Sequence, residues 1–244
     1  MNNYLSLIIP TIAGLTTILG IIPTYFKFNQ NKIINSSISF SLGVMLTISI
    51  ISLIPESLYY LNRNLIESII YILIFINIGI LTNRLIDRKV SINNNLYKLG
   101  IVSMIAIIMH NIPEGIITSI TTEKNLSLGI STSIGIALHN IPEGISISIP
   151  IYFATKSRKK AYIYTTLSGL SELLGALISI ILLKNFINNF ILAFILGITA
   201  GIMIDISINE LLKESLSYNN KKITIPSILL GIVIMLICKY IFNI

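Results

Sequence analysis

The hexapeptide His-Asn-Ile-Pro-Glu-Gly occurs twice, at residues 110–115 within IVSMIAIIMHNIPEGIITSI (101–120) and at residues 139–144 within STSIGIALHNIPEGISISIP (131–150). Both copies lie in long apolar stretches, and together they hold both histidines of the chain. A helix that crosses a membrane needs about 20 mostly apolar residues. The surroundings of each hexapeptide therefore predict a transmembrane helix with polar groups near its middle.

The composition of the 244-residue chain extends this prediction to its whole length. Hydrophobic residues make up 54% and charged residues only 11%, whereas a soluble domain carries about 25% charged residues. So little charge cannot coat a soluble surface, and so apolar a chain is not disordered. The one cysteine, Cys238, excludes a disulfide framework and a thiolate metal cluster. We therefore expect an all-α polytopic membrane protein.

Apolar stretches between charged residues predict eight transmembrane helices in a single membrane domain, residues 1–244. The predicted spans are about residues 4–26, 33–56, 66–84, 99–121, 125–152, 161–183, 186–212 and 223–241.

The basic residues predict the orientation of these spans. Of 17 Lys and Arg residues, 13 fall in loops on one side, and four (Arg63, Lys124, Lys184 and Lys239) fall on the other. Cytoplasmic loops are enriched in Lys and Arg, so we expect the side with 13 basic residues to face the cytoplasm and both termini to lie on the outer side of the cytoplasmic membrane. The net charge of +7 is then a topology signal. The expected partner is the lipid bilayer and not nucleic acid, which would need a clustered basic face on a soluble domain.

Internal repeats predict how the spans are arranged. Gly43–Ser57 and Gly201–Ser215 are identical at 8 of 15 positions, and Gly14–Gly20 matches Gly169–Gly175. These pairs, like the two hexapeptides, lie in spans that run in opposite directions. We expect a 3+2+3 arrangement, in which the first three spans are an inverted copy of the last three around a central pair. Inverted repeats are common in transporters, with the substrate near the midplane at the repeat interface. Close helix contacts are expected at small residues, namely Gly43, Gly169, Gly175, Gly197 and Gly201.

The spacing within each hexapeptide predicts a metal site. His110 and Glu114 are four residues apart and share one helix face, and the second hexapeptide repeats this pattern. Two such helices facing each other offer two imidazoles and two carboxylates, a donor set that suits Zn²⁺. The carboxylates could also bridge to a second ion held by the asparagine amides, about 3.5–4 Å from the first. The predicted ligands are His110, Asn111, Glu114, His139, Asn140 and Glu143.

The cost of burying carboxylates supports this interpretation. A charge at the bilayer centre costs roughly 2.5–3.5 kcal/mol unless it is neutralised, by a bound divalent ion or by protonation. Glu172 lies mid-span where its inverted partner is Thr17, so it is a candidate extra ligand; a protonated Glu172 bonded to a neighbouring helix is the alternative. Candidates for a transport path, with ordinary packing or snorkelling as the alternative, are Met45, Ser52, Met203, Asp205, Asn209 and Glu210.

These motifs, with SGLSELLGA at 168–176 and GIMIDISINEL at 201–211, resemble the ZIP family of divalent-metal transporters, and the short chain is most similar to bacterial zinc uptake members of that family. The resemblance implies import towards the cytoplasm through a two-metal site, and a polar inner exit at Asn209 and Glu210. Residues 85–97 lack the histidines that many relatives carry in this loop, so metal sensing by the loop is not expected. The implied first site is His110, Glu114, His139 and Glu143, and the implied second site is Asn111, Asn140, Glu172 and the same two glutamates.

We therefore expect a zinc importer of the cytoplasmic membrane and not an enzyme. Fe²⁺, Mn²⁺ and Co²⁺ are expected as further substrates, since nitrogen and oxygen ligands discriminate weakly among these ions, and no prosthetic group is expected. No nucleotide-binding loop is present, so ATP is not an expected partner. The sequence leaves open whether the protein forms a homodimer. The alternative is a membrane-embedded metal-dependent hydrolase, but a catalytic site typically keeps three ligands and an open position, whereas this ligand set is doubled and symmetric.

Overall fold

The computed structural model describes residues 4–26, 29–183 and 188–242. Residues 186 and 187 of the seventh predicted span, and the loop residues Lys27 and Lys184, lie outside the described residues.

All regular structure in the described residues is helical. The elements are α1 (Leu5–Leu15) with its 3₁₀ continuation η1 (Thr16–Tyr25); α2 (Gln30–Ile48), the π-helical η2 (Ser49–Leu53) and α3 (Ile54–Leu61); α4 (Leu65–Lys89); α5 (Asn95–Lys124); α6 (Leu126–Thr155); α7 (Arg158–Ile178) and the π-helical η3 (Ser179–Leu183); α8 (Asn189–Asp205), the π-helical η4 (Ile206–Leu212) and α9 (Lys213–Ser217); and α10 (Lys221–Phe242).

These helices account for the predicted spans, and most of them are longer than the apolar stretch. α4 continues to Lys89, beyond the predicted end at residue 84, because Arg and Lys end an apolar stretch but are good helix formers. In the described chain, seven helices are long and apolar enough to cross a membrane. α6 is not among the seven, although it has 30 residues, because its five serines lower its hydropathy further than the hexapeptide, which α5 shares, would do alone.

Asparagine and serine side chains mark where most helices begin. The side chain of Asn64 accepts a hydrogen bond from the backbone N–H of Glu67, and Asn125 accepts one from Leu128. Such N-caps satisfy an amide that has no partner within the helix. The same role is played by Asn29, Asn94, Ser157 and Asn188.

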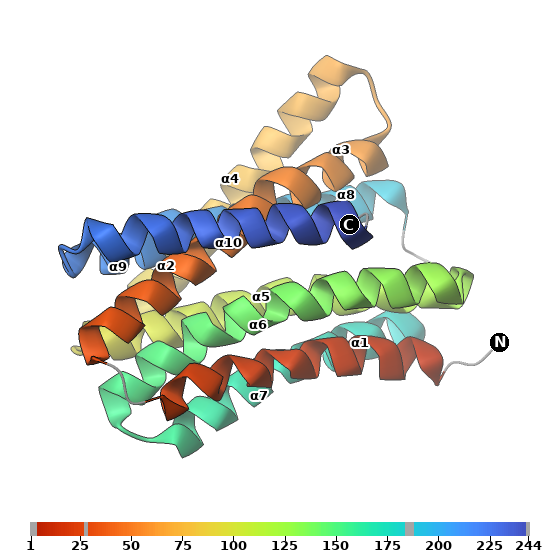
Figure 1. Ribbon diagram of the computed structural model, residues 1–244. Coiled ribbons are helices and arrows are strands. Elements are labelled where there is room, and N and C mark those ends of the chain that lie inside the picture. The colour runs from red at the N-terminus through yellow and green to blue at the C-terminus, as the bar shows by residue number, and fades with distance from the viewer. Residues whose placement is uncertain (1–3, 27–28, 184–187, 243–244) are drawn as a thin grey trace.

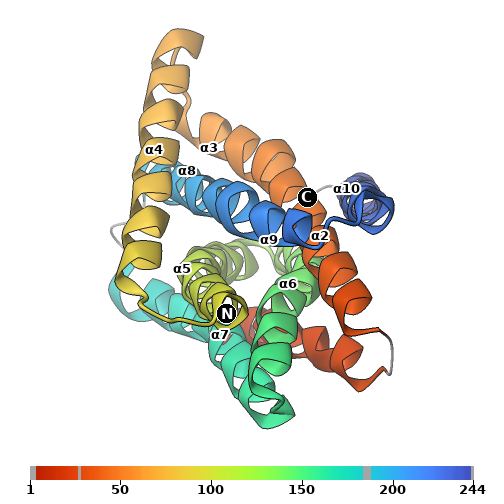
Figure 2. The ribbon, with the colours of Figure 1, turned by 90° about the vertical axis from the view of Figure 1, so that its left-hand side faces the viewer.

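α5 and α6 pack against each other at the centre of the molecule (Figures 1 and 2). α1 with η1 and α7 lie against one side of this pair, and α2 and α8 lie against the other. α10 packs on α2, and α4 packs on α8. The two hexapeptides are therefore enclosed by other helices.

The helix contacts come in pairs that follow the sequence repeats. α2 packs on α10 as α8 packs on α4, and α5 packs on α7 as α6 packs on η1. The π-helical segments η2 and η4 also fall at matching places, since Ser49–Leu53 aligns with residues 207–211 in the Gly43–Ser57 and Gly201–Ser215 match.

The matched glycines are points of close helix approach. A Cβ atom added to Gly43 would collide with the carbonyl oxygen of Ile228 in α10, and one added to Gly201 would collide with that of Ile76 in α4. The other three predicted positions, Gly169, Gly175 and Gly197, also contact another helix this closely. The prediction of close helix contact at all five glycines is confirmed.

We predict that Gly43→Ala and Gly201→Ala each destabilise the protein, by about 1–3 kcal/mol. The neighbouring atom at both positions is a backbone carbonyl oxygen, which cannot rotate away. Thermal unfolding in detergent measures the effect, with Leu128→Ala on the exposed side of α6 as the control. Unchanged unfolding midpoints in both glycine variants would contradict this packing.

Candidate metal site

The two hexapeptides bring their imidazoles and carboxylates together between α5 and α6. His110 and Glu114 lie one turn apart on α5, and His139 and Glu143 lie one turn apart on α6. Since residues four apart project from the same face of a helix, each helix presents one imidazole and one carboxylate to the other. All four side chains are buried.

Glu114 is the centre of this cluster. Its Oε1 atom lies 2.9 Å from Nε2 of His139 and 3.1 Å from Nε2 of His110. Oε1 of Glu143 lies 3.2 Å from Nε2 of His110. The two histidines thus direct the same ring nitrogen towards the two carboxylates, and one ligand atom each of His110, Glu114 and His139 lie within 4.8 Å of one another.

These distances suit a divalent metal ion. Zn²⁺ binds imidazole nitrogen and carboxylate oxygen at about 2.0–2.2 Å, so that ligand atoms in a tetrahedral site lie about 3.4 Å apart. The observed separations of 2.9–3.2 Å need to widen by only a few tenths of an ångström. Thiolate does not contribute, because Cys238 lies on α10 and packs against the hydrophobic cluster.

Many polar atoms here are buried without a hydrogen-bond partner. They include Nδ1 of both histidines and Oε2 of Glu114 and of Glu143. Buried polar atoms in folded proteins nearly always have a hydrogen-bond partner, and one without a partner can mark the position of a bound ion. The same side chains that lie close enough to hold a metal thus have unused donor atoms.

Glu172, from α7, extends this cluster. Its Oε1 atom accepts a hydrogen bond of 2.5 Å from Nδ2 of Asn140, whose Nδ2 also donates to the carbonyl of Ala13. Glu172 is fully buried, and its backbone carbonyl lies against Gly115, the residue that follows Glu114. Its Oε2 atom and Oδ1 of Asn140 have no hydrogen-bond partner. A second group of oxygen ligands therefore borders the first.

Asn111 of α5 is also hydrogen-bonded to α7. Its Nδ2 atom donates to the carbonyl oxygen of Ser168 at 3.3 Å, and its Oδ1 atom is buried without a partner. The amide is thereby held with its oxygen free, although no hydrogen bond links it to Glu172.

A small cavity adjoins the cluster. Its volume of about 40 Å³ leaves room for a few water molecules. Glu114 and His139 form one part of its wall, and Ser52 and Glu56 form another. The remaining lining residues, Ile48, Leu53, Ile117, Thr132, Ile136 and Leu196, are apolar apart from Thr132.

Comparison with known proteins identifies the family. The family model described as "ZIP Zinc transporter" matches residues 88–239. Curated proteins described as "Zinc transporter ZupT" are similar along nearly the whole chain: those of Streptococcus mutans (35% identity, 98% of both chains), Chlorobium limicola (35%, 96% of both) and Clostridium perfringens (34%, 99% of this chain and 98% of the relative).

The chain belongs to the ZIP zinc transporter family. This membership confirms the resemblance noted in the hexapeptides. It also decides between transporter and hydrolase, because ZIP proteins are transporters and not enzymes. With seven apolar helices in the part of the chain that the structure describes, it is a multi-pass membrane protein.

The residues expected along a ZIP transport path are in different environments. Ser52 lines the cavity. Met45 and Met203 are fully buried in the main hydrophobic cluster. Asn209 and Glu210 are half-buried in η4.

Asp205 makes contacts that the sequence did not indicate. Its buried carboxylate accepts from Asn83 at 3.0 Å, from Arg84 at 3.2 Å and from Asn209 at 2.6 Å. It therefore ties α4 to α8. No local pattern marks Asn83 or Arg84 as its partners, because they lie more than a hundred residues away in the chain.

We predict that Zn²⁺ raises the thermal unfolding midpoint of the purified protein in detergent. A ligand at 100 times its Kd stabilises the folded state by about 2.7 kcal/mol. His139→Ala should abolish most of this shift, because it removes an imidazole from the cluster, while Glu67→Gln, at the exposed start of α4, should keep it. A zinc shift of equal size in His139→Ala would contradict the assignment of the site.

Proposed function

We propose that this protein imports Zn²⁺ across the cytoplasmic membrane into the cytoplasm, and that it also carries Fe²⁺, Mn²⁺ and Co²⁺. The observation that supports this most strongly is the buried cluster of two imidazoles and two carboxylates between α5 and α6. A donor set of nitrogen and oxygen without thiolate suits all four ions. Its ligands come from separate helices, so a small helix movement can open the site.

The proposed site holds two ions. The first is bound by His110, Glu114, His139 and Glu143. The second lies towards Asn140 and Glu172, with Asn111 and the two hexapeptide glutamates completing its ligands. The hydrogen bond between Asn140 and Glu172 and the unpartnered oxygens around it support this second position. Multi-site binding lets an ion enter readily and leave again.

The proposed topology has eight spans within a single membrane domain, in a 3+2+3 inverted repeat. It includes α6 as the fifth span, since this helix has 30 residues and lies beside α5. The paired helix contacts and the matching π-helical segments support the repeat. The substrate site between α5 and α6 then lies at the repeat interface, as in other inverted-repeat transporters.

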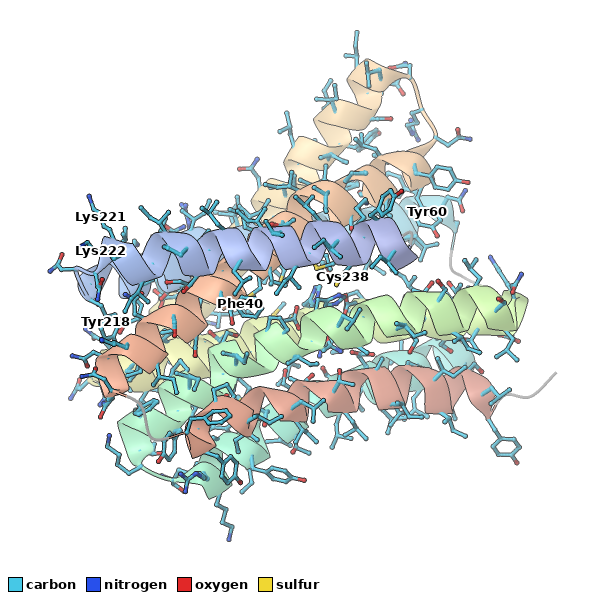
Figure 3. All side chains as sticks on the ribbon, in the orientation of Figure 1. Phe40, Tyr60, Tyr218, Lys221, Lys222 and Cys238 are labelled. Atoms are coloured by element: carbon cyan, nitrogen blue, oxygen red, sulfur yellow. The ribbon has the colours of Figure 1, made fainter. Side chains whose placement is uncertain are left out.

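Both termini are proposed to lie outside the cell. α1 begins and α10 ends towards the right-hand side of Figure 1. Lys221 and Lys222 lie at the opposite end of α10, far from Tyr60 (Figure 3). The helix ends and turns on that side carry most of the described basic residues, which supports a cytoplasmic location. The cavity lined by Glu56 then opens from the outer half of the path.

We predict that Glu143→Gln reduces zinc-65 uptake by more than tenfold. The substitution keeps the size of this fully buried side chain but removes the charge that faces His110. Uptake is measured in cells that lack their own zinc importers, with Glu67→Gln as the control and membrane abundance determined for both. Unchanged uptake by Glu143→Gln would refute the role of the central cluster in transport.

We further predict that Glu172→Ala changes metal preference more than it changes maximal zinc uptake. Glu172 contributes to the second ion position only, so the ligands of the first position stay in place. Competition uptake with Zn²⁺, Fe²⁺, Mn²⁺ and Co²⁺ measures the preference. An equal loss for all four ions would count against two separate positions.

A further inference from the structure

Where η2 passes into the start of α3, oxygen atoms lie near a lysine from the last turns of α10. Pro55 has no N–H group, so the carbonyl four residues earlier, that of Ile51, receives no α-helical hydrogen bond from position 55. Ile51 lies in the π-helical segment η2, where the regular bonding pattern is already interrupted. An unsatisfied carbonyl oxygen at this depth needs another donor.

That donor is Lys239 of α10. Its Nζ atom donates a hydrogen bond to the carbonyl oxygen of Ile51 and lies 3.4 Å from Oγ of Ser52. The charge of Lys239 also acts on the carboxylate of Glu56, one helical turn beyond Ser52, over a longer distance than in a direct ion pair. The ammonium group of Lys239 is thus held by a carbonyl oxygen and a hydroxyl, with a carboxylate beyond them.

The location of this lysine connects it to the metal site. Ser52 and Glu56 line the cavity whose far wall is formed by Glu114 and His139. No Lys or Arg is among the lining residues of this cavity, and Lys239 reaches its rim from outside through Ser52. An ion that moves through this cavity from Glu56 towards Glu114 moves along a wall that includes Ser52, to which Lys239 is bound.

We propose that Lys239 is a tethered cation at the entrance of the transport path, and that an incoming divalent ion displaces its ammonium group from Ile51 and Ser52. This proposal rests on the proposed function. The carbonyl of Ile51, the hydroxyl of Ser52 and the nearby carboxylate of Glu56 offer oxygen ligands, which suit a hydrated divalent cation. The flexible stem of lysine allows its ammonium group to move while α10 stays in place.

The positive charge of Lys239 should then weaken the binding of a metal ion at the entrance. Like charges repel, and the effect is larger in a partly buried site than in water. Removing the charge should therefore lower the KM for zinc while the central ligands, and with them the maximal rate, are preserved. A lysine that only fastens α10 to η2 would have no such effect on KM.

Two variants separate the effect of the positive charge of Lys239 from the effect of its hydrogen bond between α10 and η2. Lys239→Met removes both the charge and the hydrogen bond to Ile51, whereas Lys239→Gln removes the charge but keeps a donor group. Lys124→Met is the matched control, because it removes an exposed lysine at the same end of the molecule, away from the cavity. The assay is the concentration dependence of zinc-65 uptake in cells.

We expect both Lys239 variants to lower the KM for zinc by about fivefold, the factor for an interaction of roughly 1 kcal/mol, and Lys124→Met to leave it unchanged. Glu56→Gln in the Lys239→Met background should raise the KM again. Wild-type KM in both Lys239 variants, or a lower KM in Lys239→Met alone, would overturn the proposal. Absence of zinc uptake by the wild-type chain would instead contradict the proposed function.

Discussion

The negative charge of a carboxylate enclosed by apolar helices must be compensated by groups that the fold brings close to it. Glu114 is such a carboxylate, and the rest of the structure depends on how its charge is compensated. Nε2 atoms of His110 and His139 lie within 3.1 Å of one of its oxygens. One of these imidazoles is on the same helix and the other is on α6. The charge of Glu114 is therefore compensated only when α5 and α6 pack with their two hexapeptides side by side. The neighbouring helices hold the pair in this position.

The surrounding packing serves the same requirement. Gly144 of the second hexapeptide lies against the carbonyl oxygen of Thr17, and Gly115 of the first lies against that of Glu172. A side chain at either glycine would push a helix away from the central pair. Because Glu172 belongs to one of these close contacts, its carboxylate is also brought beside Asn140. Helix packing and ligand placement are thus consequences of the same contacts.

Much of this arrangement could be predicted from the sequence, because the decisive signals are local. The four-residue spacing of His110 and Glu114 places both on one helix face, and two copies of the hexapeptide imply two facing helices. Family membership followed from the same residues. The number of spans, their orientation and the ligand set of a second ion remain predictions.

Other features depend on contacts between segments that are distant in the chain, and the sequence did not reveal those contacts. The pairing of Asp205 with Arg84 and the contact of Lys239 with Ile51 each join residues far apart in the chain. Lys239 carried only a topology signal in the sequence, because a single charge near the end of an apolar stretch usually lies in the interface. The π-helical segments also have no signal in residue types, although they fall at equivalent positions of the repeat.

The central claim is that the buried imidazoles and carboxylates bind the transported ion directly. X-ray absorption at the zinc edge of the zinc-loaded protein tests this most directly, because imidazole has a characteristic outer-shell scattering pattern. The account predicts nitrogen and oxygen neighbours at about 2.0–2.2 Å, with two imidazoles around the ion of the first position. A shell without imidazole, or one with sulfur at about 2.3 Å, would contradict it.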